Sequence, residues 1–339
     1  MNQGSMNTSN MNAISPAGKF LWQVKREYWE HRGGFLWTPL IIALVMLAFM
    51  AMGLITAEFT AHRNGFTLNG IHIDQLTSHI DADAMAKFQG ALDVGLITMG
   101  MPIRIALFVV VFFYALGALY NDRADRSVLF WKSLPLSDTG TVLAKVTAGL
   151  VVAPALAVLG MIALQLGFLI LMTLYAAIHG INALPYLWSP THLIALWVKL
   201  AVLIPVNALW ALPTMGWLLL CSSFARSKPF LWAMMPLIAG VIVSWTQLTG
   251  SFSFGGWFWR HIVGRLLLSL IPESWINLDS LRALDHAGAD PGIALSNLLS
   301  FGSIADQFAT PNFLIGVAAG VAMIAMAIWL RRSRVEAYA

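Results

Sequence analysis

The chain has 339 residues, of which 58% are apolar and only 11% are charged, whereas soluble domains carry roughly 25% charged residues. So few charges cannot cover a water-soluble globule of this size. The composition therefore excludes a soluble enzyme and predicts a polytopic membrane protein. The net charge of +4 does not indicate a nucleic-acid-binding protein, because the basic residues form short clusters between apolar runs.

The two ends of the chain are polar. The N-terminal stretch is rich in Asn and Ser, and we expect residues 1–18 to form a disordered tail. The first long apolar run starts at Gly33 and is too long for the apolar part of a cleavable signal, so we expect it to remain as an anchor. Residues 332–339 are expected to form a second, cytoplasmic tail.

Residues 19–32 have the pattern of an amphipathic helix. At about 100° per residue, apolar side chains fill one arc: Phe20, Leu21, Val24 and Tyr28, widened by Trp22 and Trp29. Polar side chains fill the opposite arc: Gln23, Arg26, Glu27 and Glu30. With its basic residues, this pattern predicts a helix lying on the cytoplasmic leaflet. The alternative is an ordinary basic segment beside the first span.

Long apolar runs follow this segment. A hydrocarbon core about 30 Å thick needs roughly 20 apolar residues in helical conformation. Six runs within residues 33–331 meet this requirement and predict an all-α membrane domain with transmembrane helices at about 34–57, 97–120, 146–178, 193–224, 229–249 and 311–330. Arg104 and Lys199 lie toward the expected outer ends of two spans. We expect their side chains to reach water there, the alternative being contact with a substrate.

The distribution of charge orients the predicted helices. Thirteen of the 20 Lys and Arg residues fall in the short segments on the same side as the N-terminus, and ten of the 16 acidic residues fall on the other side. By the positive-inside rule, both termini are expected in the cytoplasm. The outer side then holds the longer segments 58–93 and 250–310, whose roles the sequence leaves open. Within the second, residues 257–271 predict a short apolar helix that is interfacial or re-entrant.

No catalytic or metal-binding motif is recognisable. Five His and Asp residues of the first outer segment lack a metal-ligand spacing, so we expect no metal site there: His72, Asp74, His79, Asp81 and Asp83. The single cysteine, Cys221, excludes an internal disulfide and a Cys-based zinc cluster, and its apolar surroundings predict a buried thiol. There is no P-loop, so we expect the chain to bind no cofactor and to hydrolyse no ATP by itself.

The second inner loop, residues 121–145, is the most specific part of the sequence. Its features in order are an acidic–Arg pair, a small hydroxyl residue, an aromatic, a Ser-Leu-Pro-aliphatic-Ser run and a basic residue: Asp122 and Arg123, Ser127, Phe130, Ser133-Leu134-Pro135-Leu136-Ser137 and Lys145. This loop resembles the second inner loop of the permease subunits of type-2 ABC exporters. The usual Glu-Arg-Glu opening of that family is Asp122-Arg123-Ala124 here, with Asp125 one residue late.

The resemblance implies a permease subunit in the inner membrane of a bacterium. It implies a second permease subunit, in a homodimer or heterodimer, and cytoplasmic P-loop ATPase subunits that bind the ATP and grip a coupling helix in this loop. The residues expected to form the coupling loop are Asp122, Arg123, Arg126, Phe130, Trp131, Lys132, Leu134, Pro135 and Ser137. Phe130 and Trp131 would supply the apolar anchor for the partner. The alternative is a basic loop that these two rings anchor to lipid.

The transported substrate cannot be identified from the sequence, and the resemblance alone implies an amphipathic compound. Gln165 and Asn207 are polar residues inside predicted spans, and they are candidates for a translocation path, with interhelical hydrogen bonding as the alternative. Two other functions stay open. One is a membrane-embedded lipid-modifying enzyme, which would need an acidic or His cluster at a membrane face. The other is a regulatory membrane component that transports nothing.

Overall fold

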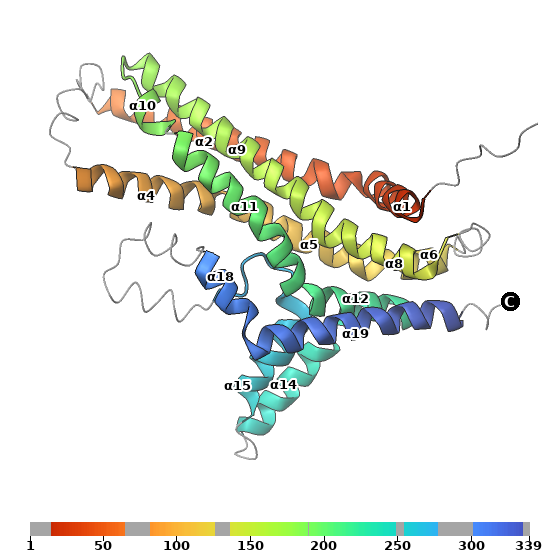
Figure 1. Cartoon of the computed structure of the whole chain (residues 1–339). Helices are drawn as coiled ribbons and strands as arrows, with labels where there is room; N and C mark the ends of the chain where they lie inside the picture. Colours follow the sequence, from red (N-terminus) through yellow and green to blue (C-terminus); the bar gives the residue numbers. More distant parts are fainter. Residues whose placement is uncertain are drawn as a thin grey trace, which may run out of the picture.

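The computed structural model describes residues 15–64, 82–125, 136–188, 190–248, 254–276 and 301–334. All regular structure in these residues is helical, as predicted, and Figure 1 shows long helices running side by side. Five helical runs are long and apolar enough to cross a membrane: Gly33–Arg63, Lys87–Ala124, Asp138–Ile178, Leu193–Trp210 and Pro311–Ser333. The chain is an integral membrane protein of helical fold.

Most of these runs are assembled from consecutive helices. The first run joins the π-helical turn η1 (Gly33–Trp37) to α2 (Thr38–Arg63). The second consists of α4 (Ala82–Met99), α5 (Met101–Ala118) and α6 (Tyr120–Ala124), and the third of α8 (Asp138–Thr147), η2 (Ala148–Val152) and α9 (Ala153–Ile178). The last two lie in α11 (Pro190–Trp210) and α19 (Pro311–Arg334), and two short helices, α10 (Leu184–Leu187) and α18 (Phe301–Phe308), flank them.

Two of the predicted spans differ from the structure. The span at 193–224 is divided at Ala211 into α11 and α12 (Leu212–Phe224), because Pro213 lacks a backbone N–H and occupies the first turn of a new helix. The span at 229–249 consists of α13 (Pro229–Ala233) and α14 (Met235–Leu248), and its apolar helix is shorter than the five candidate spans.

The short apolar helix predicted at 257–271 is present and pairs with α14. It comprises α15 (Gly255–Phe258) and the π-helix η3 (Trp259–Leu268), both of which pack against α14. The Trp259 indole N–H donates to the Ser244 hydroxyl of α14 at 2.6 Å. Together these helices form a hairpin that projects away from α12 and α19 in Figure 1.

Glycines bring α12 and α19 into close contact. A Cβ atom on Gly320 would lie 2.6 Å from the carbonyl carbon of Leu212, and one on Gly216 would lie 2.6 Å from the carbonyl oxygen of Gly320. Close approach of two backbones through small residues is a common way for helices to associate in membranes. The buried apolar cluster around this pair includes Cys221, so the predicted burial of the thiol is confirmed.

The N-terminal helix α1 (Pro16–Glu30) begins earlier than predicted, because the Ser15 hydroxyl accepts a hydrogen bond from the Gly18 N–H and Pro16 suits a first helical turn. Most of its polar arc does not face water, although Glu30 is exposed. Glu27 is 0% exposed, whereas Leu21 and Trp22 on the apolar arc are 65% and 62% exposed. The helix therefore packs its polar side against α8 and leaves its apolar side free for lipid.

Candidate functional site

Four segments that the sequence assigns to one side of the membrane lie together at one end of the bundle. They are α1, the described residues of 119–138, residues 222–228 and the last turn of α19, and we call this region the basic end. The Ser222 hydroxyl accepts hydrogen bonds from the backbone N–H groups of Leu119 and Tyr120. In Figure 1 the basic end lies on the side where the C-terminus is marked.

A network of six charged side chains from four helices occupies the basic end: Glu27, Asp122 and Asp138 with Arg26, Lys145 and Arg331. Lys145 Nζ lies 3.1 Å from Glu27 and 3.5 Å from Asp122. Arg331 pairs with Asp122 at 3.0 Å and with Asp138 at 3.1 Å. The described members of the network are three positive and three negative charges. This balance is what allows ionised groups to be buried.

Glu27 lies at the centre of this network. Its carboxylate accepts a hydrogen bond from the Tyr114 hydroxyl at 3.0 Å and lies 2.6 Å from the Arg26 guanidinium. Burial acts to raise the pKa of Glu27, but Lys145 and Arg26 outweigh this effect and hold the pKa below its ordinary value of 4.5. The carboxylate therefore stays charged and joins α1 to α5 and α8.

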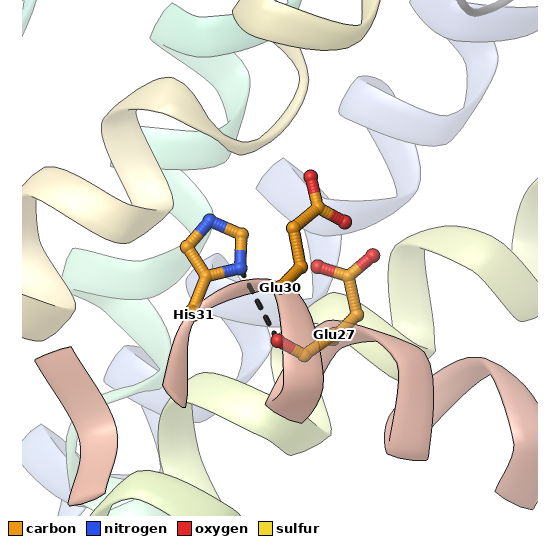
Figure 2. A group of neighbouring side chains, drawn as sticks. All are labelled: Glu27, Glu30 and His31. Carbon is orange, nitrogen blue, oxygen red and sulfur yellow. Dashed lines mark hydrogen bonds between the residues drawn. The ribbon is translucent and has the colours of Figure 1, made fainter. Parts of the chain in front are cut away.

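Figure 2 shows Glu27 with its neighbours Glu30 and His31 at the end of α1. Ligand atoms of these three residues lie within 4.8 Å of one another, which is close enough for a metal ion. The His31 Nδ1 atom lies 3.2 Å from the carbonyl oxygen of Glu27. A metal would have to compete with Lys145 and Arg26 for the Glu27 carboxylate, so we assign that carboxylate to the charge network.

The described residues of the predicted coupling loop make contacts with other helices of the same chain or cap the helix that follows them. Asp122 belongs to the charge network. The guanidinium of Arg123 donates to the carbonyls of Leu119, Ser222 and Ala225 and so satisfies the C-terminal end of α12. The Ser137 hydroxyl accepts from the Gly140 N–H and caps α8. The remaining predicted residues of the loop lie outside the described part of the chain: Arg126, Phe130, Trp131, Lys132, Leu134 and Pro135.

Gln165 and Asn207 both make hydrogen bonds between segments. Gln165 donates from Nε2 to the Leu96 carbonyl of α4 at 3.0 Å, and its Oε1 accepts from the Trp197 indole of α11 at 2.9 Å. The Oδ1 atom of Asn207 accepts from the Glu273 backbone N–H at 3.2 Å and from the Trp275 indole at 3.1 Å. Gln165 therefore holds three helices together, and Asn207 holds the chain that follows η3 against α11.

A cavity lies beside Asn207, between α5, η2, α9, α11 and residues 270–273. Arg104 and Glu273 provide its charged groups, with Arg104 Nη1 3.5 Å from the Glu273 carboxylate. Burial raises the pKa of Glu273, although Arg104 acts in the opposite direction. The expectation that Arg104 reaches water is wrong, because the residue is only 5% exposed and Glu273 supplies a counter-charge inside the protein. Lys199, in contrast, is partly exposed.

Most of these charged residues were not predicted as site residues, among them Glu27, Asp138, Arg331 and Glu273. For Glu27 the sequence shows only that it is one of two acidic residues, with Glu30, in a segment rich in Lys and Arg. Arg331 and Glu273 carry no local signal, because their partners are far away in the sequence.

No protein-family model matches this sequence, and no curated protein or solved structure shows significant similarity to it. The functional assignment therefore rests on the helical membrane fold, the charge network at the basic end and the cavity beside Arg104.

Proposed function

We propose that this chain is the transmembrane permease subunit of an ATP-driven exporter of the type-2 ABC class. The observation that carries the proposal is the way both ends of the inner loop are attached to the bundle. Asp122 lies at the start of the loop and Asp138 follows its Ser-Leu-Pro-Leu-Ser run, and both pair with Arg331 of α19. Arg123 binds the end of α12. A partner that displaces the loop would therefore displace four helices together.

An ABC permease needs such a connection because it contains no ATPase of its own. Work done by ATP binding in a partner can change the transmembrane helices only through a contact that both share. The partner must also bind two arrangements of the helices with different affinity. Buried ion pairs suit this purpose, since they attach the loop to the bundle and removing one partner of such a pair costs about 3–5 kcal/mol.

In this proposal the basic end faces the cytoplasm of a bacterial cell, and the chain lies in the inner membrane with both termini inside. The helix α13 and the hairpin that α14 forms with α15 and η3 make up the sixth membrane segment. Two cytoplasmic P-loop ATPase subunits bind the ATP, and a second permease subunit completes the assembly. The chain itself carries no catalytic residue and no cofactor, and its cargo is an amphipathic compound.

The test is a double substitution in the loop, Phe130→Ala with Trp131→Ala, in a chain co-expressed with a candidate P-loop ATPase partner. Loss of a buried aromatic anchor costs about 2 kcal/mol or more at an interface, which lowers affinity about thirtyfold. We therefore expect the double variant to insert in the membrane but to lose co-purification with the ATPase. The purified chain alone is expected to hydrolyse no ATP.

Phe59→Ala is the matched control, because this ring is exposed on α2, outside the basic end, and should not affect the partner. If the double variant still assembled fully with the ATPase and the ATPase activity were undiminished, the loop would only connect two helices and would not bind the ATPase. A lipid-modifying enzyme would behave differently, since its activity would persist in the chain without any ATPase.

A further inference from the structure

A small polar cluster joins α2 to the end of α9, far from the basic end. In Figure 1 these two helices run side by side from α1 toward α10. Glu58 lies on α2, Tyr175 lies on α9, and His179 follows the last residue of α9; we call these three residues the distal cluster. Glu58 is about 38 Å along the helical run that starts at Gly33, whereas a hydrocarbon core is about 30 Å thick. The distal cluster therefore lies within reach of water.

The contacts of His179 require one extra proton. Its Nδ1 atom lies 2.8 Å from the backbone carbonyl oxygen of Tyr175, which can only accept a hydrogen bond, so Nδ1 carries a proton. Its Nε2 atom lies 3.1 Å from the Glu58 carboxylate, and the same oxygen accepts from the Tyr175 hydroxyl at 3.1 Å. A neutral imidazole and an ionised carboxylate would place two lone pairs against each other there. A second proton must therefore lie between Nε2 and the carboxyl group.

This contact holds together the ends of two helices that otherwise share little there. Glu58 makes the only hydrogen bonds between α2 and the chain of α9 with its C-cap, in the part that the structure describes. The buried apolar cluster between the two helices reaches only to Leu47 on α2 and Leu164 on α9. Farther along, Phe59 and Ile178 are 70% and 75% exposed. The distal ends of the helices therefore depend on the polar contact.

The distal cluster is open to water and has no other charged neighbour among the described residues. The side chain of Glu58 is 47% exposed and that of His179 is 7% exposed, so a proton can exchange with water on the Glu58 side. The hydrogen bonds and ion pairs of both residues stay within the distal cluster. No such contact comes from the other titratable side chains described on α2 and on the elements packed against α2 and α9: His62, Arg63, Arg104, Tyr114, Tyr186 and Lys199.

We propose that Glu58 and His179 form a proton-binding site that clasps the distal end of α2 to α9. With the proton bound, the imidazolium and the carboxylate attract each other. When the proton leaves to water, Nε2 and the carboxylate oppose each other with lone pairs, and the clasp opens. The pair binds and releases this proton as one unit.

The sign of the pH dependence follows from the proton count. Histidines change charge between about pH 5 and 8. The joined arrangement is therefore favoured at the acidic end of this range and is lost as the pH rises. With the basic end in the cytoplasm, as proposed above, the site responds to the pH on the opposite side of the membrane. Opening of the clasp is a property of this chain alone and does not depend on the ATPase.

The experiment measures the distance between the two helix ends in the full chain, purified into phosphatidylcholine nanodiscs. Spin labels on Thr60→Cys and Ala177→Cys, both exposed positions, report this distance by electron paramagnetic resonance in a Cys221→Ala background. At about pH 5 we expect one narrow distribution of distances. At about pH 8 the distribution should shift to longer distances and broaden, and the change should reverse on acidification.

Two substitutions separate the proton from the contact. In Glu58→Gln the new amide can donate to Nε2 of a neutral His179, so the helix ends should stay together at both pH values, a gain that misfolding cannot produce. In His179→Phe a ring remains but no proton can bind, so the long distances should appear at both pH values. His62→Gln is the matched control, because this histidine is exposed on α2 one turn beyond Glu58, and it should keep the pH dependence of the unsubstituted chain.

Three results would overturn the proposal. One is the same distribution of distances in the unsubstituted chain at both pH values. Another is a pH dependence that survives in Glu58→Gln or in His179→Phe, since a different group would then bind the proton. The third is loss of the pH dependence in His62→Gln, which would assign the titration to His62. Each would leave the coupling function intact, since co-purification of the ATPase does not involve the distal cluster.

Discussion

Among single residues, Lys145 has the largest role in the charge network at the basic end, since it pairs with both Glu27 and Asp122. Lys145→Met would leave two buried carboxylates without this cation. Removing one partner from a buried ion pair costs about 3–5 kcal/mol. We therefore expect a clear loss in the free energy of unfolding, visible as a lower melting temperature of the purified chain in detergent.

Lys25→Met is the matched control, because Lys25 is exposed on α1 and should contribute little. The combination Glu27→Gln with Lys145→Met should be more stable than Lys145→Met alone, since it also neutralises one of the stranded carboxylates. Equal melting temperatures for Lys145→Met and Lys25→Met would mean that the network does not stabilise the fold.

Because of Glu27, we also expect the stability of the folded chain to depend on pH. Its pKa in the folded chain lies below the ordinary value of 4.5, because Lys145 and Arg26 outweigh the effect of burial. A lowered pKa means that the charged form stabilises the folded state above about pH 4.5, and that this contribution is lost as the pH falls through the lowered pKa. We expect the melting temperature to fall with acidification below that point. In Glu27→Gln this part of the dependence should disappear, and an identical pH profile in both proteins would contradict the assignment.

Among the elements, the pairing of α12 with α19 depends on Gly320. An added methyl group would lie 2.6 Å from the Leu212 carbonyl carbon, so Gly320→Ala must push the two helices apart. Overpacking of this kind typically costs about 1–3 kcal/mol. We expect a lower melting temperature for Gly320→Ala.

Gly53→Ala is the matched control, because a Cβ at that position of α2 meets no atom within 4 Å and the helix propensity changes by the same amount. If both variants melted alike, close packing of α12 on α19 would not limit stability.

For the whole molecule, the charge distribution and the fold together predict a topology. The test uses single cysteines in a Cys221→Ala background. Cysteines at Glu30 and Arg226 measure the accessibility of the basic end, and cysteines at Asn64 and Asn182 measure that of residues outside it. All four positions are exposed. A membrane-impermeant maleimide should label Asn64→Cys and Asn182→Cys in intact cells. It should label Glu30→Cys and Arg226→Cys only after permeabilisation, since basic segments remain in the cytoplasm. The reverse pattern would place the basic end outside and remove the basis for a cytoplasmic ATPase.

The sequence by itself determined that this chain is a helical membrane protein, and it located most of the long helices. That was possible because lipid imposes a local rule, in which each span needs about 20 apolar residues with every backbone group paired inside the helix. The same local reasoning found α1 and the buried Cys221. It was less reliable for residues 229–249, where composition alone did not reveal that α14 would be short and would pair with α15 and η3.

Only the tertiary structure decided what the polar side chains do. Glu27 and Lys145 are 118 residues apart, and Asp122 and Arg331 are 209 residues apart. Nothing in the local sequence separates the buried Glu27 from the exposed Glu30, or the buried Arg104 from an arginine that reaches water. A charge becomes buried only when the fold brings an opposite charge beside it, and that depends on the packing of distant helices. Most of the polar arc of α1 therefore faces inward, and the cavity beside Arg104 could be found only in three dimensions.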